Sequence, residues 1–122
     1  MDNTEDLKEI TKQYEYLMNQ IDSKMVLTEK KLRDQKIENI CEVIIGDFCD
    51  DALSLVWTNQ WNSCGYETET WALCISDSVK TKYWKYWPLD VRIMAAMRID
   101  AFIDEVCYTM REMEEKAKEI TG

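Results

Sequence analysis

Residues 53–76 read LSLVWTNQWNSCGYETETWALCIS, and this stretch decides the fold class because its apolar and polar residues alternate. Alternation with a period of two is typical of β-strands, whose successive side chains point to opposite faces. The segment NSCG at residues 62–65 has the composition of a turn, and its glycine can adopt a positive φ. We therefore predict an antiparallel hairpin with strands over residues 53–61 and 66–76.

A third strand is expected over residues 79–87, which include the stretch KTKYWKYW at residues 80–87. Its lysines and aromatic rings are also typical of a surface that binds nucleic acid, where cations contact phosphates and rings stack on bases. Lysines guard exposed sheet edges against pairing, however, so we interpret the segment as a guarded edge strand. Alternation predicts that Tyr83 and Trp87 line the core, which leaves Trp84 or Tyr86 for an interface.

Two helices are expected before the hairpin. Apolar residues recur there at spacings of three and four, which is the pattern of a heptad. The first stripe consists of Leu7, Ile10, Tyr14, Leu17 and Ile21. It predicts a helix over residues 5–21. A second apolar stripe, which consists of Leu32, Ile37, Ile40, Cys41, Ile44, Ile45 and Phe48, predicts another helix over residues 28–50. One bent helix over residues 5–50 is the alternative.

Residues 89–120 show the clearest helical pattern. Their apolar residues keep the same spacing over three heptads, and Pro88 suits the first turn of a helix. The stripe consists of Ile99, Ile103, Val106, Met110, Met113, Ala117 and Ile120. The width of the stripe, extended by Phe102 and Cys107, predicts a helix that faces a core.

The expected fold class is therefore α+β: two N-terminal helices, a three-stranded antiparallel β-meander and one long C-terminal amphipathic helix. A chain of 122 residues suits a single domain over residues 1–122. No stretch is apolar enough to span a membrane. The five cysteines are an odd number and the start is acidic rather than a signal peptide, so we expect a reducing cytoplasm.

The charge of the chain points to a class of partner. A net charge of −9 repels phosphate, which argues against direct nucleic-acid binding and against anionic membranes. Residues 37–77 contain eight acidic residues and neither lysine nor arginine. The expected partner-binding residues are Glu38, Glu42, Asp47, Asp50, Asp51, Glu67, Glu69 and Asp77, with Trp84 or Tyr86 as aromatic anchors. A solvated acidic face that only confers solubility is the alternative.

Most catalytic chemistries lack the residues they need. The chain has no histidine, which excludes Ser-His-Asp and Cys-His catalysis and histidine-ligated zinc. The cysteines lack close zinc-ligand spacing, so we expect core thiols, with Cys64 in the turn as a candidate exposed thiol. We expect no cofactor. An alternative enzyme is a magnesium-dependent phosphohydrolase using Glu38, Glu42 and Asp47 on a helix, although no E-x-x-D motif accompanies them.

Size and charge together favour a small acidic interaction protein rather than an enzyme. Such a protein would bind and block a basic surface on a protein that itself binds nucleic acid. Phage anti-defence proteins such as anti-CRISPRs, and antidotes to nucleic-acid-cleaving toxins, act in this way. A structural homodimer through the heptad helices is a third alternative.

Overall fold

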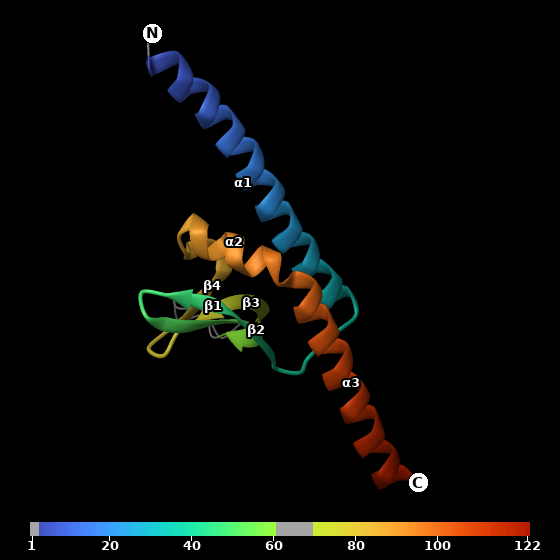
Figure 1. Cartoon of the computed structure of the whole chain (residues 1–122). Helices are drawn as coiled ribbons and strands as arrows, with labels where there is room; N and C mark the ends of the chain where they lie inside the picture. Colours follow the sequence, from blue (N-terminus) through green and yellow to red (C-terminus); the bar gives the residue numbers. More distant parts are fainter. Residues whose placement is uncertain (1–2, 61–69) are drawn as a thin grey trace.

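A computed structural model describes residues 3–60 and 70–122 and confirms the α+β class. The elements follow the order α1 (Asn3–Asp34), β1 (Cys41–Phe48), β2 (Asp51–Gln60), β3 (Thr70–Ser76), β4 (Thr81–Tyr83), the 3-10 helix η1 (Trp84–Tyr86), α2 (Leu89–Met97) and α3 (Ile99–Thr121). The strands form one antiparallel sheet in the order β1-β2-β3-β4. The sheet is therefore a four-stranded meander, one strand larger than predicted (Figure 1).

The prediction of two N-terminal helices is wrong. Residues 3–34 form one uninterrupted helix, α1, and residues 41–48 of the predicted second helix form the edge strand β1. The helix ends in a turn in which Lys36 adopts a φ of 55°. The backbone N–H of Ile37 donates to the carbonyl of Leu32 at 3.0 Å and closes the end of α1. The chain then leaves the helix axis and enters the sheet.

The predicted strands all have counterparts. Strand β2 covers residues 53–60 of the predicted 53–61, and β3 falls within the predicted 66–76. Residue 61, the predicted turn at 62–65 and residues 66–69 lie outside the described residues. The third predicted strand, 79–87, is shorter than expected. Only residues 81–83 pair with β3, and the chain then turns into η1.

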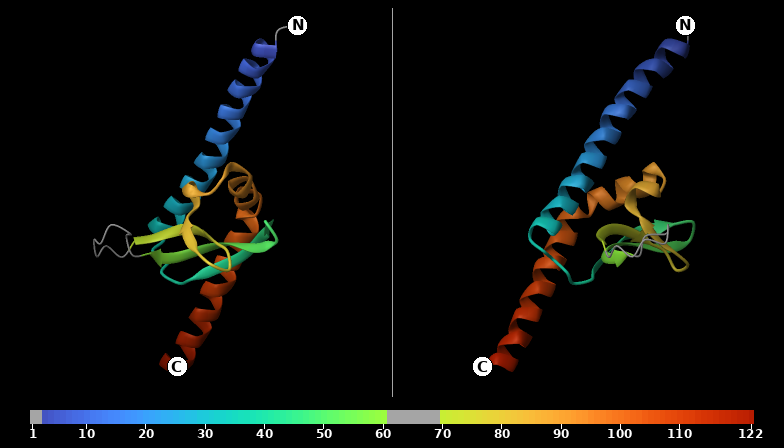
Figure 2. Two further views of the ribbon diagram at one scale, coloured as in Figure 1. Left: turned by 90° about the vertical axis from the view of Figure 1, so that its left-hand side faces the viewer. Right: turned by 180° about the vertical axis from the view of Figure 1, so that it is seen from behind.

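The predicted C-terminal helix over residues 89–120 is divided at Arg98. Pro88 precedes its first turn as expected, but Arg98 adopts φ −106° and ψ 9°, which separates α2 from α3. The break changes the direction of the chain, so that α2 lies across the sheet while α3 leads away from it (Figures 1 and 2). Two differently directed helices therefore replace the single one that was predicted.

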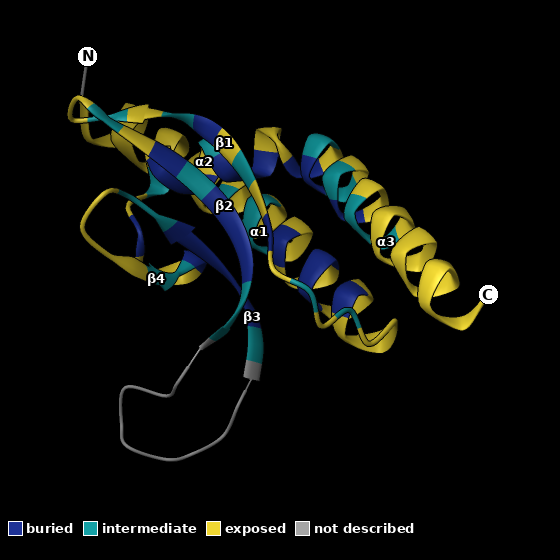
Figure 3. Ribbon diagram, turned by 90° about the horizontal axis from the view of Figure 1, so that it is seen from below, coloured by how far each residue is buried: buried dark blue, intermediate teal, exposed yellow. Residues whose placement is uncertain are grey.

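The core lies between the sheet and the three helices. The largest fully buried side chains of the sheet side are Trp57, Leu53, Leu55, Leu73 and Ile75, and those of the helical side include Met25, Val91 and Phe102. Figure 3 shows the buried residues gathered where the sheet and the helices meet, with the outer part of α3 exposed. A smaller cluster of Val56, Ala72 and Cys74 occupies the other face of the sheet, because these residues alternate with the core positions of β2 and β3.

A buried carboxylate joins α1 to the sheet. Glu29 is 2% exposed, and its Oε1 accepts hydrogen bonds from the Tyr83 hydroxyl and from Trp84 Nε1, the latter at 2.6 Å. Its Oε2 accepts from Arg33 Nη2 at 3.0 Å and from the backbone N–H of Leu73 at 3.4 Å. Arg33 Nε in turn donates to the carbonyl of Trp71 at 3.1 Å. Because β4 pairs with β3 only from Cys74 onward, this ion pair of α1 covers the part of the β3 edge that β4 leaves unpaired.

The lysine-rich segment does form an edge of the sheet. Strand β4 is the terminal strand, and the Nζ atoms of Lys80 and Lys82 lie 5.2 Å and 4.8 Å from the ring centroid of Trp87. These lysines therefore cover an aromatic ring while their charges stay near water. Trp87 is buried as expected and Tyr83 is half-buried, but Trp84 is buried as well.

In the described part of the chain, no helix combines the length and the apolar character needed to cross a membrane.

Candidate functional site

Four of the predicted acidic residues lie along one edge of the sheet, and the others do not. Glu42 and Asp47 lie on β1, Glu38 precedes this strand and Asp50 follows it in the β1–β2 turn, and all four side chains are exposed. Among the described residues, none of these four carboxylates takes part in an ion pair. Four unneutralised negative charges therefore lie along one terminal strand.

A β-bulge brings two of these acids to the same face of the sheet. Glu42 pairs with Val56 and Ile44 pairs with Ser54, but the register then shifts so that Asp47 pairs with Ala52. Since residues 52, 54 and 56 of β2 alternate with its core positions, their partners on β1 share the outer face. Without the extra residue in β1, the side chain of Asp47 would point to the opposite face.

Gly46 makes this bulge possible. Its φ is 147°, a conformation that residues with a Cβ rarely adopt. A Cβ atom at this position would also lie 2.4 Å from Cε of Met94 on α2. Glycine therefore permits this backbone conformation and leaves room for the end of the Met94 side chain. Through the bulge it also sets the direction in which Asp47 points.

Two exposed isoleucines lie among these acids. Ile44 is 65% exposed on β1, and Ile40, just before the strand, is 64% exposed. Both were expected to be buried, because the predicted helix over residues 28–50 placed them in its apolar stripe. The β-branched run at residues 43–45 was the signal that favoured a strand instead. We call the set Glu38, Ile40, Glu42, Ile44, Asp47 and Asp50 the acidic edge.

Asp51 and Asp77 differ from the acidic edge because they are engaged in turns. Asp51 Oδ2 accepts from the backbone N–H and the hydroxyl of Ser78, at 3.1 Å and 2.7 Å. Asp77 Oδ1 accepts from the backbone N–H groups of Val79 and Lys80, at 2.9 Å and 2.7 Å. The hydrogen bonds from Lys80 and Val79 lower the pKa of the Asp77 carboxyl. Both carboxylates therefore stabilise the β3–β4 turn.

The remaining predicted contact residues are separated from the acidic edge. Glu67 and Glu69 lie outside the described residues. Trp84 is 1% exposed and donates to Glu29, so the expectation that it could form an interface is corrected. Tyr86 is 73% exposed, but it follows β4, at the opposite end of the sheet from β1. The chain turns into η1 instead of continuing as a strand, and this turn buries Trp84.

The carboxylates proposed for a magnesium site do not share a helix. Glu38 lies in the α1–β1 connection, while Glu42 and Asp47 lie on β1, so the spacing of four residues does not place them on one helical face. Within residues 3–60 and 70–122, no three histidine, cysteine, aspartate or glutamate residues are arranged to hold a metal ion.

The cysteines fall into two groups. Cys41 and Cys74 are buried, and Cys49 and Cys107 are exposed, while Cys64 lies outside the described residues. Burial and the nearby charge of Glu29 raise the pKa of the Cys74 thiol to about 12, and burial also raises the pKa of Cys41. These two thiols stay protonated at neutral pH and act as small core residues, as predicted. The expectation of a core position is wrong for Cys49, which lies in the β1–β2 turn, and for Cys107, which was expected to widen the core-facing stripe of the last helix.

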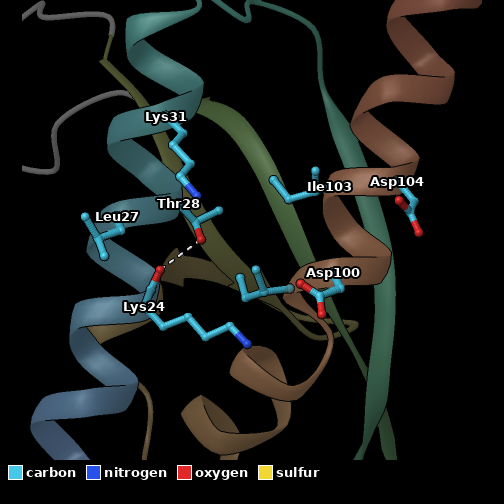
Figure 4. A pocket seen from close by; sticks show the side chains of 8 residues that line it. Lys24, Leu27, Thr28, Lys31, Asp100, Ile103 and Asp104 are labelled. Atoms are coloured by element: carbon cyan, nitrogen blue, oxygen red, sulfur yellow. Dashed lines mark hydrogen bonds between the residues drawn. The ribbon is translucent and has the colours of Figure 1, made fainter.

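A groove of about 440 Å³ lies between α1 and α3 (Figure 4). Lys24 and Lys31 come from α1, and Asp100 and Asp104 come from α3. The hydroxyl of Thr28 donates to the carbonyl of Lys24 at 2.8 Å, so it is used within the helix. The lining therefore combines opposite charges with apolar side chains but offers no activated nucleophile.

Comparisons with known proteins found no matching family model, no matching curated protein and no matching solved structure. The chemistry of the surface is therefore the basis for the function proposed below.

Proposed function

We propose that this chain is a small acidic interaction protein that binds a basic, nucleic-acid-binding surface of a partner protein and blocks it. The acidic edge carries the proposal. Its four exposed carboxylates and two exposed isoleucines lie along a terminal strand, within a segment of 41 residues that contains neither lysine nor arginine.

The charge of this edge supports a basic partner. Closely spaced carboxylates repel one another, and a positive surface relieves that repulsion when it binds. Opposite charges attract before contact, which raises the association rate and makes binding sensitive to salt. Grooves that hold nucleic acid are lined by lysine and arginine, so they match this surface in sign.

The isoleucines support a protein rather than a free cation as the partner. Ile44 lies between Glu42 and Asp47 on the outer face, and burial of an exposed aliphatic side chain contributes roughly 1.5–3 kcal/mol. An apolar contact surrounded by charges is the usual anatomy of a protein interface. Occupancy of this kind requires no catalytic residue, and it matches the mode of action of phage anti-defence proteins and of antidotes to nucleic-acid-cleaving toxins.

Capture from a host lysate tests the proposal. The edge variant Glu42→Lys/Asp47→Lys is compared with the control variant Glu115→Lys/Glu119→Lys, whose substitutions lie on the exposed end of α3. Each variant replaces two acids by two bases, so both carry −5 instead of −9. We expect the wild type and the control to capture the same basic protein at low salt and to release it at high salt. Equal capture by the edge variant would contradict the proposal.

A further inference from the structure

One apolar stripe of α1 continues beyond the part of the helix that packs on the rest of the molecule. In the C-terminal half of α1, Met25 and Leu32 are buried against the core. In the N-terminal half the same stripe stays exposed, and it consists of Leu7, Ile10, Tyr14 and Leu17, with half-buried Ile21 at the junction. Figures 1 and 2 show this half of α1 projecting away from the sheet and from α2.

A second apolar feature adjoins the stripe where α1 leaves the core. A groove of about 580 Å³ lies between α1 and α2, and Ile21 belongs both to this groove and to the stripe. The rest of the apolar lining comes from Leu27, Ile93, Ala96 and Met97. Met97 is 78% exposed. The stripe and the groove therefore form one continuous apolar surface that no described element covers.

We propose that a second copy of this chain covers this surface by antiparallel pairing of the two α1 helices. In this register Ile10 faces Ile21 of the second copy, and Tyr14 faces Leu17 of the second copy, so the heptad positions from Ile10 to Ile21 each meet an apolar position of the other helix. A twofold axis generates every contact twice. The first turn of the second copy's helix then reaches the groove between α1 and α2.

Charge determines the orientation. Glu5 and Asp6 form an acidic first turn, and antiparallel pairing places this turn beside Lys24 of the second copy, which lines the groove. Parallel pairing would instead place the two acidic first turns side by side. It would also bring together the bodies of two chains that each carry −9. Antiparallel pairing separates the bodies along the helices.

The flanks of the stripe favour self-association. Between Leu7 and Ile21, the positions on either side of the exposed stripe are occupied by Thr11, Gln13, Met18 and Gln20, none of which is charged. A second copy therefore meets no like charge along the seam. The exposed stripe of α3 differs, because Glu114 and Lys116 flank Met113 and support a solvated helix face. The α1 surface is also distinct from the acidic edge, so the two proposals stand independently.

The molar mass of the full-length chain in solution tests the proposal. Light scattering or sedimentation should give twice the 14.5 kDa of one chain. The variant Ile10→Glu/Leu17→Glu should give a single chain, while the control Val79→Glu/Ile120→Glu, which adds the same charge at exposed apolar positions, should remain a dimer. The near-ultraviolet tryptophan signal should be the same in all three proteins, because none of the substituted residues belongs to the core. A wild-type mass of one chain would overturn the proposal.

Two further measurements test the orientation. Lys24→Glu should weaken dimerisation roughly tenfold, and the added changes Glu5→Lys and Asp6→Lys should restore it by reversing the charge of the opposing turn. A photo-crosslinking amino acid in place of Leu7 should form covalent links to residues 21–27 or 93–97 of the second copy. Links to residues 3–11 of the second copy would show parallel pairing and would overturn the proposed arrangement.

Discussion

The carboxylate of Glu29 on α1 accepts a hydrogen bond from the indole Nε1 of Trp84 at 2.6 Å, across 55 residues of sequence. Both side chains are buried, and the same carboxylate also accepts from Tyr83, Leu73 and Arg33. A buried carboxylate is tolerated when donors surround it in this way. Glu29 therefore connects the N-terminal helix with β3 and η1.

Replacement of Glu29 by glutamine should destabilise the fold by roughly 3 kcal/mol. The amide nitrogen takes the place of one acceptor oxygen, and a buried donor left without an acceptor costs about 1–3 kcal/mol. Urea unfolding at neutral pH measures the change. Glu114→Gln is the matched control, because the side chains of its ion pair with Lys118 are 66% and 71% exposed and an exposed ion pair contributes less than about 1 kcal/mol. Equal losses for the two variants would contradict this role of Glu29.

Tyr83 should make stability depend on alkaline pH. Burial, the hydrogen bond to Glu29 and its charge raise the pKa of the Tyr83 phenol from 10.0 to about 12. Because the folded state favours the neutral phenol, this contribution is complete below the unfolded pKa and is lost as pH rises from about 10 towards 12. The difference in unfolding free energy between the wild type and Tyr83→Phe should therefore shrink over this range. A constant difference would show that Tyr83 does not titrate in this way.

Gly46→Ala should destabilise the chain by more than about 1 kcal/mol, because alanine is strained at a φ of 147°. Thermal or urea unfolding measures the loss. The contact with Met94 is a separate contribution, so the substitution is repeated in a Met94→Ala background. The backbone strain should persist there. If Gly46→Ala costs nothing in that background, the φ constraint is not what selects glycine at the bulge.

The ion pair between Arg92 and Asp22 should be worth more than the exposed pair on α3. Arg92 Nη1 lies 3.1 Å from Asp22 Oδ1, and the side chains are 11% and 25% exposed. Asp22→Ala should cost roughly 2 kcal/mol, because it leaves a largely buried guanidinium without its carboxylate. Glu114→Ala, which removes the exposed partner of Lys118, should change stability by no more than about 0.5 kcal/mol. Chemical denaturation of both variants compares the two pairs.

The sequence patterns predicted the hairpin of β2 and β3, a helix in the N-terminal part of the chain and helical structure in the C-terminal part. They failed at β1. The inward positions of β1 include buried Cys41 and Ile45 and half-buried Phe48, at spacings of four and three. The spacing of four is two strand periods, and the bulge near Gly46 adds the spacing of three, so that the two together resemble a helical period. Periodicity alone therefore predicted a helix where the chain forms an edge strand.

Two helix boundaries differ from the predicted ones. The first helix was predicted to end at residue 21, but α1 continues through Asp22 and Ser23, and Asp22 pairs with Arg92. The break at Arg98 has no local marker, since neither glycine nor proline lies nearby. Four acids of the candidate site were predicted at exposed positions. The exposure of Ile44 in the acidic edge was missed, because its side chain points outward in strand β1 but was placed on the apolar face of the predicted helix.

Displacement of nucleic acid from the captured partner tests the central claim most directly. Fluorescence anisotropy follows a labelled oligonucleotide bound to that partner while the wild type, the edge variant Glu42→Lys/Asp47→Lys or the control Glu115→Lys/Glu119→Lys is added. We expect the wild type and the control to release the oligonucleotide at similar concentrations and the edge variant to leave it bound. Release by the edge variant at the same concentration as the wild type would contradict a blocking role for the acidic edge.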